Sequence, residues 1–182
     1  MTGKLIVLSG PGGVGKSTIV GELRRYENFF FSVSVTTRQP RVGETDGVDY
    51  HFVDENRFDQ MIANGDFLEW AHFAGFRYGT PSAPVITALD QGLDVLLEIE
   101  IDGARQIRRN RPDALLVFLQ PPSMLDLEER IRGRGTDSPE RIAARLELAR
   151  IEMAAAGEFD QILVNHEVGQ VVAALVSLAA AK

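Results

Sequence analysis

Short apolar runs alternate with longer amphipathic segments over most of the chain. The runs at 4–9, 94–101, 114–119 and 161–165 are each followed by a segment with helical spacing. We expect helices over about Gly15–Arg25, over 101–109, from Met124 onward, and over the Ala-, Val- and Leu-rich C-terminal segment. Because buried strands that alternate with helices are typical of a parallel sheet covered on both faces, the pattern predicts an α/β core.

The segment 32–80 breaks this rhythm, since its apolar runs are short, alternating and rich in aromatic residues. SVSVTT, VDYHFV and FLEWAHF predict short strands, and RQPRVGETDG predicts a turn-rich connector. We therefore expect a small, more antiparallel lobe inserted into the core. A second irregular segment, IRGRGTDSPERIAARLELAR, contains a glycine-rich loop, and Ser138 before Pro139 predicts the start of a helix.

Two glutamates interrupt the apolar run VLLEIEIDG at 95–103. Glu98 and Glu100 are two residues apart, so in a strand they would share one face. Carboxylates are almost never fully buried without a partner, and side chains at the carboxyl end of a parallel strand point into the crevice where ligands bind. We expect both glutamates to face cations and hydrogen-bond donors. The alternative is two partly exposed residues paired with nearby arginines.

The composition is that of an ordinary globular domain. Apolar residues make up 45% and charged residues 25% of the 182 residues, which suits one well-buried core. Cysteine is absent, which excludes disulfides and thiolate chemistry, and the three histidines lack zinc-ligand spacing. No apolar run is long enough to span a bilayer and the N-terminal segment does not resemble a signal peptide, so we expect a cytoplasmic protein.

The charge distribution argues against a general nucleic-acid binder. The formal net charge is −7, whereas binding to backbone phosphates needs a basic surface. Only three of the nineteen basic residues are lysines, and the arginines cluster at 38–41 and 130–134. Each cluster is either solvated surface charge or a local phosphate-binding group, since the guanidinium fork suits phosphate oxygens.

The strongest motif is GPGGVGKST, which matches G-x-x-x-x-G-K-[ST] and lies between a predicted strand and a predicted helix. In this motif, glycines let backbone N–H groups surround phosphate oxygens, and the helix N-terminus adds its dipole. Lys16 would reach the β- and γ-phosphates, and the Ser17 hydroxyl would ligate Mg²⁺. The motif predicts a purine nucleoside triphosphate site formed by Gly10, Pro11, Gly12, Gly13, Val14, Gly15, Lys16, Ser17 and Thr18.

Residues further along suggest the acceptor. Arg38 and Arg41 flank a proline turn and Tyr50 follows a second turn, so two guanidiniums and a phenol could converge on one anion. Glu69 alternates with apolar residues, where a carboxylate needs hydrogen-bond donors. Guanine offers N1–H and N2–H₂ side by side, whereas adenine lacks N1–H, and such sites discriminate by about 10⁴–10⁵. The alternative for Glu69 is a solvated strand residue.

In these motifs the chain resembles the guanylate kinase family. GPGGVGKST, SVSVTTRQPRVGE, DYHFV, FLEWA, YGT, RIRGRGTDS and ILVN follow in the family's order and spacing over nearly the whole chain. Many families share the P-loop, whereas TTRxPRxGE followed by Tyr50 and YGT is far more particular. The resemblance implies a P-loop kinase core with a parallel sheet covered by helices on both faces (about 1–31, 81–124 and 150–182), an inserted mixed α/β GMP-binding lobe (about 32–80) and a helical lid (about 125–149).

The resemblance also implies roles for individual residues. The phosphate of GMP would be held by Arg38, Arg41, Tyr50 and Tyr78, and the guanine would be read by Ser34, Glu69, Thr80 and Glu100. The transferred phosphoryl group would be neutralised by Lys16, Arg41, Arg130, Arg134 and Arg145. Asn165 would lie near the adenine of ATP, and Ser17 and Glu98 would lie on the Mg²⁺ side.

The reaction so implied is transfer of the γ-phosphoryl group of MgATP to GMP, and also to dGMP, in purine nucleotide metabolism. The expected partners are these small nucleotides, with no nucleic acid and no membrane. Two alternatives remain: a related interaction module that binds phosphopeptides, and another phosphoryl transferase of similar fold. Three departures from the family pattern are Glu98-Ile-Glu100 for Asp-x-Asp, Gly12 for a more usual Ser, and His166 and Glu167 where acidic residues are typical after Asn165.

Overall fold

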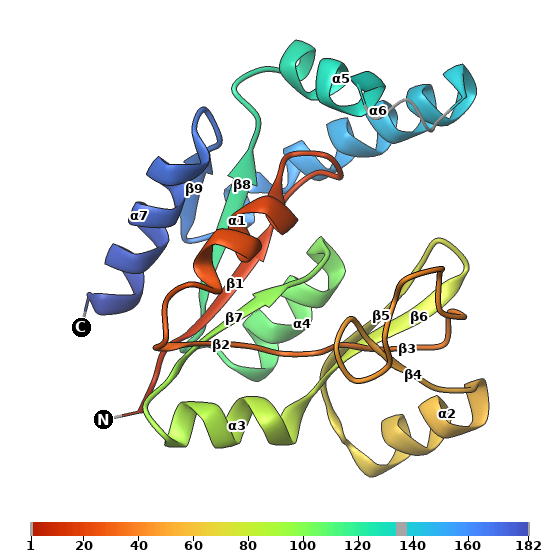
Figure 1. Cartoon of the computed structure of the whole chain (residues 1–182), viewed down its shortest axis with the longest axis vertical. Helices are drawn as coiled ribbons and strands as arrows, with labels where there is room; N and C mark the ends of the chain where they lie inside the picture. Colours follow the sequence, from red (N-terminus) through yellow and green to blue (C-terminus); the bar gives the residue numbers. More distant parts are fainter. Residues whose placement is uncertain (1, 134–137, 182) are drawn as a thin grey trace. The chain divides into compact units, whose positions relative to one another are not determined.

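The computed structural model describes residues 2–133 and 138–181. Its parallel sheet has the strand order β2-β7-β1-β8-β9, and a second, four-stranded sheet has the order β4-β3-β6-β5 (Figure 1). The chain divides into two compact units. The first consists of the residues up to Leu5, Asn28–Leu97 and Asp102–Ala114, and the second of Ile6–Glu27, Glu98–Ile101 and the residues from Leu115 onward.

The second unit holds three parallel strands, β1 (Leu5–Ser9), β8 (Leu115–Gln120) and β9 (Gln161–Val164). Every residue of β1 is buried, as expected for a strand covered on both faces. Helices α1 (Lys16–Leu23) and α7 (Val168–Ala180) pack against each other. On β8, Phe118 lies in an apolar cluster with Ile101, Ala155 and Ala156. The predicted α/β fold with a parallel sheet and flanking helices is confirmed.

Two further helices of this unit, α5 (Met124–Gly133) and α6 (Pro139–Ala154), also pack together (Figure 1). The predicted start of α6 is confirmed, because the Ser138 hydroxyl accepts a hydrogen bond from Arg141 N at 3.4 Å and Pro139 occupies the first turn. A short 3₁₀ helix, η1 (Ala156–Glu158), follows α6 and leads to β9.

The first unit contains the four-stranded mixed sheet. In this sheet β3 (Val35–Thr36) pairs parallel with β4 (His51–Phe52) and antiparallel with β6 (Phe76–Pro81), which in turn pairs antiparallel with β5 (Phe67–Phe73). Elsewhere in the unit β2 (Phe29–Phe31) pairs parallel with β7 (Asp94–Glu98). The helices are α2 (Glu55–Asn64), α3 (Ser82–Asp90) and α4 (Ile101–Asn110).

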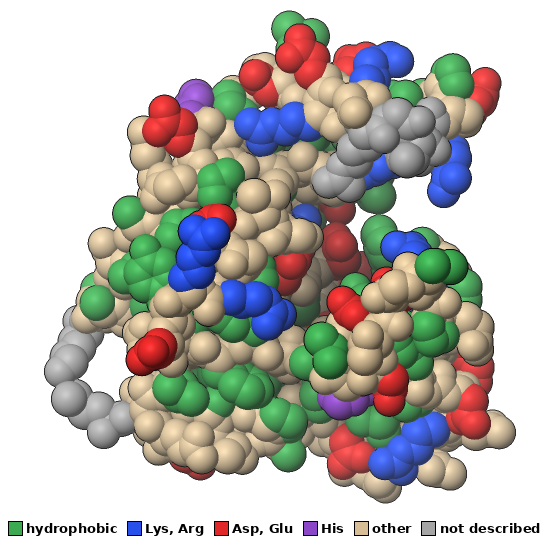
Figure 2. Space-filling view, in the orientation of Figure 1, with side chains coloured by type: hydrophobic (Ala, Val, Ile, Leu, Met, Phe, Trp, Pro, Cys, Tyr) green, Lys and Arg blue, Asp and Glu red, His purple; other side chains and the backbone are tan. Residues whose placement is uncertain are grey.

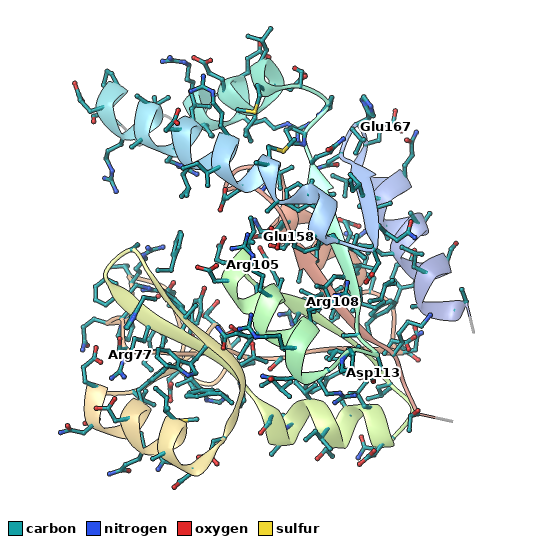
Figure 3. All side chains as sticks on the ribbon, turned by 180° about the vertical axis from the view of Figure 1, so that it is seen from behind. Arg77, Arg105, Arg108, Asp113, Glu158 and Glu167 are labelled. Carbon is teal, nitrogen blue, oxygen red and sulfur yellow. The ribbon has the colours of Figure 1, made fainter. Side chains whose placement is uncertain are left out.

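Helix α2 is attached to the four-stranded sheet by packing and by charge. Phe58 is fully buried and its ring stacks on that of Phe67, with centroids 4.7 Å apart. Arg77, labelled in Figure 3, forms ion pairs with Glu55 and with Asp59, the latter at 2.6 Å, and its guanidinium lies 4.7 Å from the Phe58 ring centroid. These contacts attach α2 to β5 and β6.

The structure differs from the predicted elements in two ways. The strand expected over 94–101 ends at Glu98, because the chain turns into α4 at Ile101, so Glu100 lies in the connector rather than in the strand. The apolar pattern also missed β2, α2, α3 and β6. The segment 32–80 lies in the first unit, and the described part of 125–149 lies in the second. The division into core, lobe and lid stays a prediction.

Charged side chains of both signs are scattered over the face drawn in Figure 2. Among residues 2–133 and 138–181, no helix combines the length and hydrophobicity needed to span a bilayer.

Candidate active site

The P-loop connects β1 to α1 and needs glycine for steric reasons, most strictly at Gly10 and Gly15. Gly10 and Gly15 have φ angles of 147° and 107°, which L side chains rarely adopt. A Cβ atom on Gly15 would lie 2.7 Å from Asn165 Nδ2, and one on Gly10 would lie 2.1 Å from the Leu119 carbonyl oxygen. The glycines therefore permit both the loop conformation and its close approach to the neighbouring strands.

Several predicted residues lie directly on this loop. Lys16 is buried, and its Nζ donates to the carbonyl oxygens of Gly10 and, at 3.4 Å, Pro11. The Val14 carbonyl accepts from Asn165 Nδ2 at 2.8 Å and from Arg130 Nη1 at 3.0 Å. Arg130 and Asn165 are thus brought to the P-loop, and Arg130 Nη2 also donates to the Asn165 carbonyl at 3.0 Å. The predicted contact of Asn165 with adenine stays a prediction.

Ser17 and Glu98 form the pair expected to hold Mg²⁺. The Ser17 hydroxyl donates to Glu98 Oε1 at 3.1 Å. Although Glu98 is exposed, the surrounding protein desolvates its carboxyl and raises the pKa, while Lys16 and Ser17 act in the opposite direction. A hydroxyl and a carboxylate are hard oxygen ligands that suit Mg²⁺. Among the described residues, no group of three or more His, Cys, Asp or Glu could hold a metal ion.

Glu152 on α6 was missed by the sequence reasoning. Its side chain is only 8% exposed, and Oε2 accepts from Gly12 N at 3.3 Å. Desolvation and the neighbouring Glu100 raise the pKa of Glu152 to about 7, although Lys16 and Gly12 lower it. Glu100 therefore lies beside a second carboxylate, and its predicted contact with guanine stays a prediction. A sequence signal existed, because Glu152 continues the buried stripe of Ile142, Leu146 and Ala149 on α6.

In the first unit, three of the four residues predicted to read guanine fall in one row across the four-stranded sheet. Glu69 pairs with Thr80 in the register of β5 and β6, and the Thr80 hydroxyl donates to Glu69 Oε1 at 2.5 Å. The register Val35↔Gly79 and Thr36↔Tyr78, continued by one residue, puts Ser34 opposite Thr80. Glu69 and Thr80 are 6% and 1% exposed. Burial raises the pKa of Glu69, and Thr80 opposes that shift.

The predicted phosphate ligands cluster on the same lobe. The Arg38 guanidinium is buried and lies 5.3 Å from the Tyr50 ring centroid, and the Tyr50 and Tyr78 rings are 5.9 Å apart. Glu44 binds both Arg38 Nη atoms at 2.9 Å and also accepts from Arg41 N at 2.7 Å. Glu44 and, to a lesser extent, Tyr78 raise the pKa of Arg38, and Arg38 lowers the pKa of Glu44.

Three further arginines, Arg41, Arg134 and Arg145, were predicted to lie at the transferred phosphoryl group. Arg41 is exposed, and its backbone N–H donates to Glu44 Oε2 at 2.7 Å. Arg145 lies on α6 and is half-buried. Arg134 lies outside the described residues. Glu44 was missed as an anchor, although an acidic residue directly after the Arg38–Arg41 turn is a signal that could have identified it.

Comparison with known proteins identifies the family. A family model described as Guanylate kinase matches residues 2–182. The chain belongs to the guanylate kinase family. A guanylate kinase from Thermobifida fusca is 60% identical over 98% of this chain and 91% of its own length, and one from Streptomyces coelicolor is 53% identical over 96% and 89%. A crystal structure of guanylate kinase from Anaplasma phagocytophilum superposes with a TM-score of 0.80 at 30% identity, covering 98% of this chain and 85% of that chain.

Membership in the guanylate kinase family confirms the resemblance, the enzyme class and the P-loop kinase fold expected from the sequence. It argues against the alternative of another phosphoryl transferase of similar fold.

Proposed function

We propose that the chain transfers the γ-phosphoryl group of MgATP to GMP, giving ADP and GDP. The observation that carries this proposal is the row of Ser34, Thr80 and Glu69 on the four-stranded sheet. It offers two hydroxyls and a buried carboxylate beside one another, which matches the O6 acceptor and the N1–H and N2–H₂ donors of guanine. Adenine has no N1–H and would leave the Glu69 carboxyl without that donor.

The donor half of the reaction belongs to the P-loop. Backbone N–H groups of 10–18 and the N-terminus of α1 would bind the ATP phosphates, as in other P-loop enzymes. The Lys16 ammonium, which donates to loop carbonyls in this structure, would turn to the β- and γ-phosphates. Ser17 and Glu98 would hold Mg²⁺, which supplies charge neutralisation at the phosphates when bound.

The acceptor half belongs to the lobe around Arg38. Two guanidiniums and two phenols, from Arg38, Arg41, Tyr50 and Tyr78, would hold the GMP phosphate. Glu44 already binds Arg38 through both nitrogens, so the guanidinium is oriented before a phosphate arrives. The Glu100 contact with the guanine amino group is part of this proposal.

The transfer step needs no general base. An oxygen of the GMP phosphate, already anionic, forms a bond to the γ-phosphorus, and the bond from that phosphorus to the β–γ bridging oxygen breaks. ADP leaves with the electron pair of the broken bond. The obstacle is repulsion between two anionic groups, and it is offset by cationic side chains that neutralise the transferred group: Lys16, Arg41, Arg130, Arg134 and Arg145.

The proposed substrates also suggest a second acceptor and a metabolic role. Deoxyguanylate presents the same base and phosphate as GMP, so dGMP is expected as a second acceptor. Both products are purine nucleotides, which assigns the enzyme to purine nucleotide metabolism, and a cytoplasmic location stays a prediction.

An acceptor panel tests the proposal. Phosphoryl transfer from MgATP is measured with GMP, AMP, CMP and UMP in turn, by coupling ADP formation to NADH oxidation. The expected result is that GMP gives by far the highest kcat/KM. Turnover of AMP at a rate equal to or above that of GMP would refute the proposed acceptor.

A further inference from the structure

Glu69 lies on a strand that has neighbours on one side only. In the four-stranded sheet β5 is an edge strand, paired with β6 alone. The pairing is also irregular immediately before Glu69, since the register shifts between Phe67 and Glu69 and leaves Leu68 out of the ladder. Such bulges bend a strand and re-aim nearby side chains, and an edge has unpaired backbone groups. The direction of the Glu69 carboxylate therefore depends on what fixes this stretch of β5.

Two side chains of α4 fix the β5 backbone on both sides of Glu69. Gln106 Oε1 accepts from Trp70 N at 3.2 Å, and Gln106 Nε2 donates to the Trp70 carbonyl at 2.6 Å. One turn further along the same helix face, Asn110 Nδ2 donates to the Leu68 carbonyl at 3.2 Å. Gln106 thus pairs with Trp70 as an adjacent strand would, and Asn110 holds the residue that the bulge leaves unpaired.

We propose that Gln106 and Asn110 are positioning residues for guanine recognition, because they fix the β5 backbone at Leu68 and Trp70 and so set the direction of the Glu69 carboxylate. This inference rests on the proposed function. A carboxylate that accepts two adjacent donors must be correctly placed in both distance and angle, so even a small rotation of β5 weakens one of the two bonds.

Helix α4 is held in place by buried apolar residues rather than by the Gln106 and Asn110 amides. Ala104 and Ile107 are 1% and 0% exposed and provide the apolar anchor of the helix. At the sheet edge, water could satisfy the Trp70 and Leu68 backbone groups without help from α4. Loss of the amide contacts should therefore loosen the strand at Glu69 more than it unfolds the lobe.

The test is a double-mutant cycle with GMP and AMP as acceptors. Gln106→Leu and Asn110→Ala are made in the natural chain and in Glu69→Gln. Gln170→Leu on α7 is the matched control, since the Gln170 amide donates to Glu167, its neighbour in sequence. For each variant kcat and KM are measured separately, and urea unfolding checks the fold.

We expect Gln106→Leu to raise KM for GMP about three- to tenfold, as loss of one or two hydrogen bonds implies, with kcat changed less than about twofold. Asn110→Ala should act in the same direction by about two- to fivefold. AMP turnover should change less than about twofold in either variant. In the Glu69→Gln background, both substitutions should change GMP kcat/KM less than about twofold, since they act through Glu69.

The inference is overturned if GMP and AMP kcat/KM fall equally, or if the full loss persists in the Glu69→Gln background. It is also overturned if both variants have the same KM for GMP as the control Gln170→Leu. If Gln106→Leu does not fold, the Asn110→Ala cycle decides by the same criteria. Failure of the proposed function gives a different result, because the unsubstituted chain would then show no preference for GMP, and this inference would fall with it.

Discussion

Replacing Glu152 by Gln should stabilise the protein above neutral pH and leave it nearly unchanged in acid. The side chain lies beside Glu100 and accepts from Gly12 N at 3.3 Å. A glutamine has the same shape, its carbonyl oxygen can accept from Gly12, and its amide can donate to Glu100. The substitution therefore removes one negative charge from a desolvated site and preserves the contacts there.

The magnitude follows from the pKa, which burial and Glu100 raise from 4.5 to about 7. Between these values the folded chain binds a proton that the unfolded chain has released. The free energy of unfolding of the unsubstituted protein must therefore fall as pH rises through this window. The pKa difference of Glu152 between the folded and the unfolded chain corresponds to about 3 kcal/mol of unfolding free energy, at about 1.4 kcal/mol per tenfold change in proton affinity. Residual solvent screening reduces it, so we expect a gain of about 1–2 kcal/mol for Glu152→Gln at pH 8.

The assay is urea unfolding of both proteins at pH 5, 6, 7 and 8, with Tm measured alongside. At pH 8 the variant should have a Tm higher by roughly 2–8 °C, and the difference should shrink toward zero at pH 5. Glu147→Gln is the matched control, since Glu147 lies on the same helix and forms an exposed ion pair with Arg150 at 2.9 Å. A pH-independent difference, or a less stable Glu152→Gln at pH 8, would contradict the reasoning.

Three further outcomes are expected. Gly15→Ala should destabilise the chain by roughly 1–3 kcal/mol in urea unfolding and raise KM for ATP. The control Gly21→Ala, with open space around it in α1, should be neutral or stabilising by up to about 1 kcal/mol. Equal effects of the two substitutions would contradict the steric argument. Glu44→Gln should raise KM for GMP about tenfold because Arg38 loses its anchor, and an unchanged KM would refute that role. Glu98→Gln should raise the Mg²⁺ concentration for half-maximal activity by about tenfold, and an unshifted titration would remove Glu98 from the metal site.

Elements that depend on residues close together in the sequence were predicted correctly. The P-loop at 10–18 needs a strand, a glycine turn and a helix within one short stretch, and all three were predicted in place. Ser138 and Pro139 likewise specify the start of α6 within three residues. The apolar runs predicted β1 and β8 because strands buried on both faces leave an uninterrupted apolar signature. The run at 161–165 also predicted β9, although three of its four residues are exposed.

The sequence could not predict contacts between distant segments. Glu152 meets Gly12 across 140 positions and Gln106 meets Trp70 across 36, and no local rule pairs such residues. Strand β6 was missed because FRYGTP contains glycine and proline, which are depleted in strands, although its pairing with β5 overrides that preference. Glu100 was expected on a strand face because periodicity does not reveal where β7 gives way to α4.

The most direct test of the central claim is the kcat/KM of the unsubstituted chain and of Glu69→Gln with GMP and AMP, measured side by side. The unsubstituted chain should strongly prefer GMP. Glu69→Gln should lose most of the GMP activity, because one acceptor oxygen becomes an amide that faces a donor on guanine. AMP turnover should change little. An unchanged GMP kcat/KM in Glu69→Gln would contradict the claim that the row of Ser34, Thr80 and Glu69 reads the base.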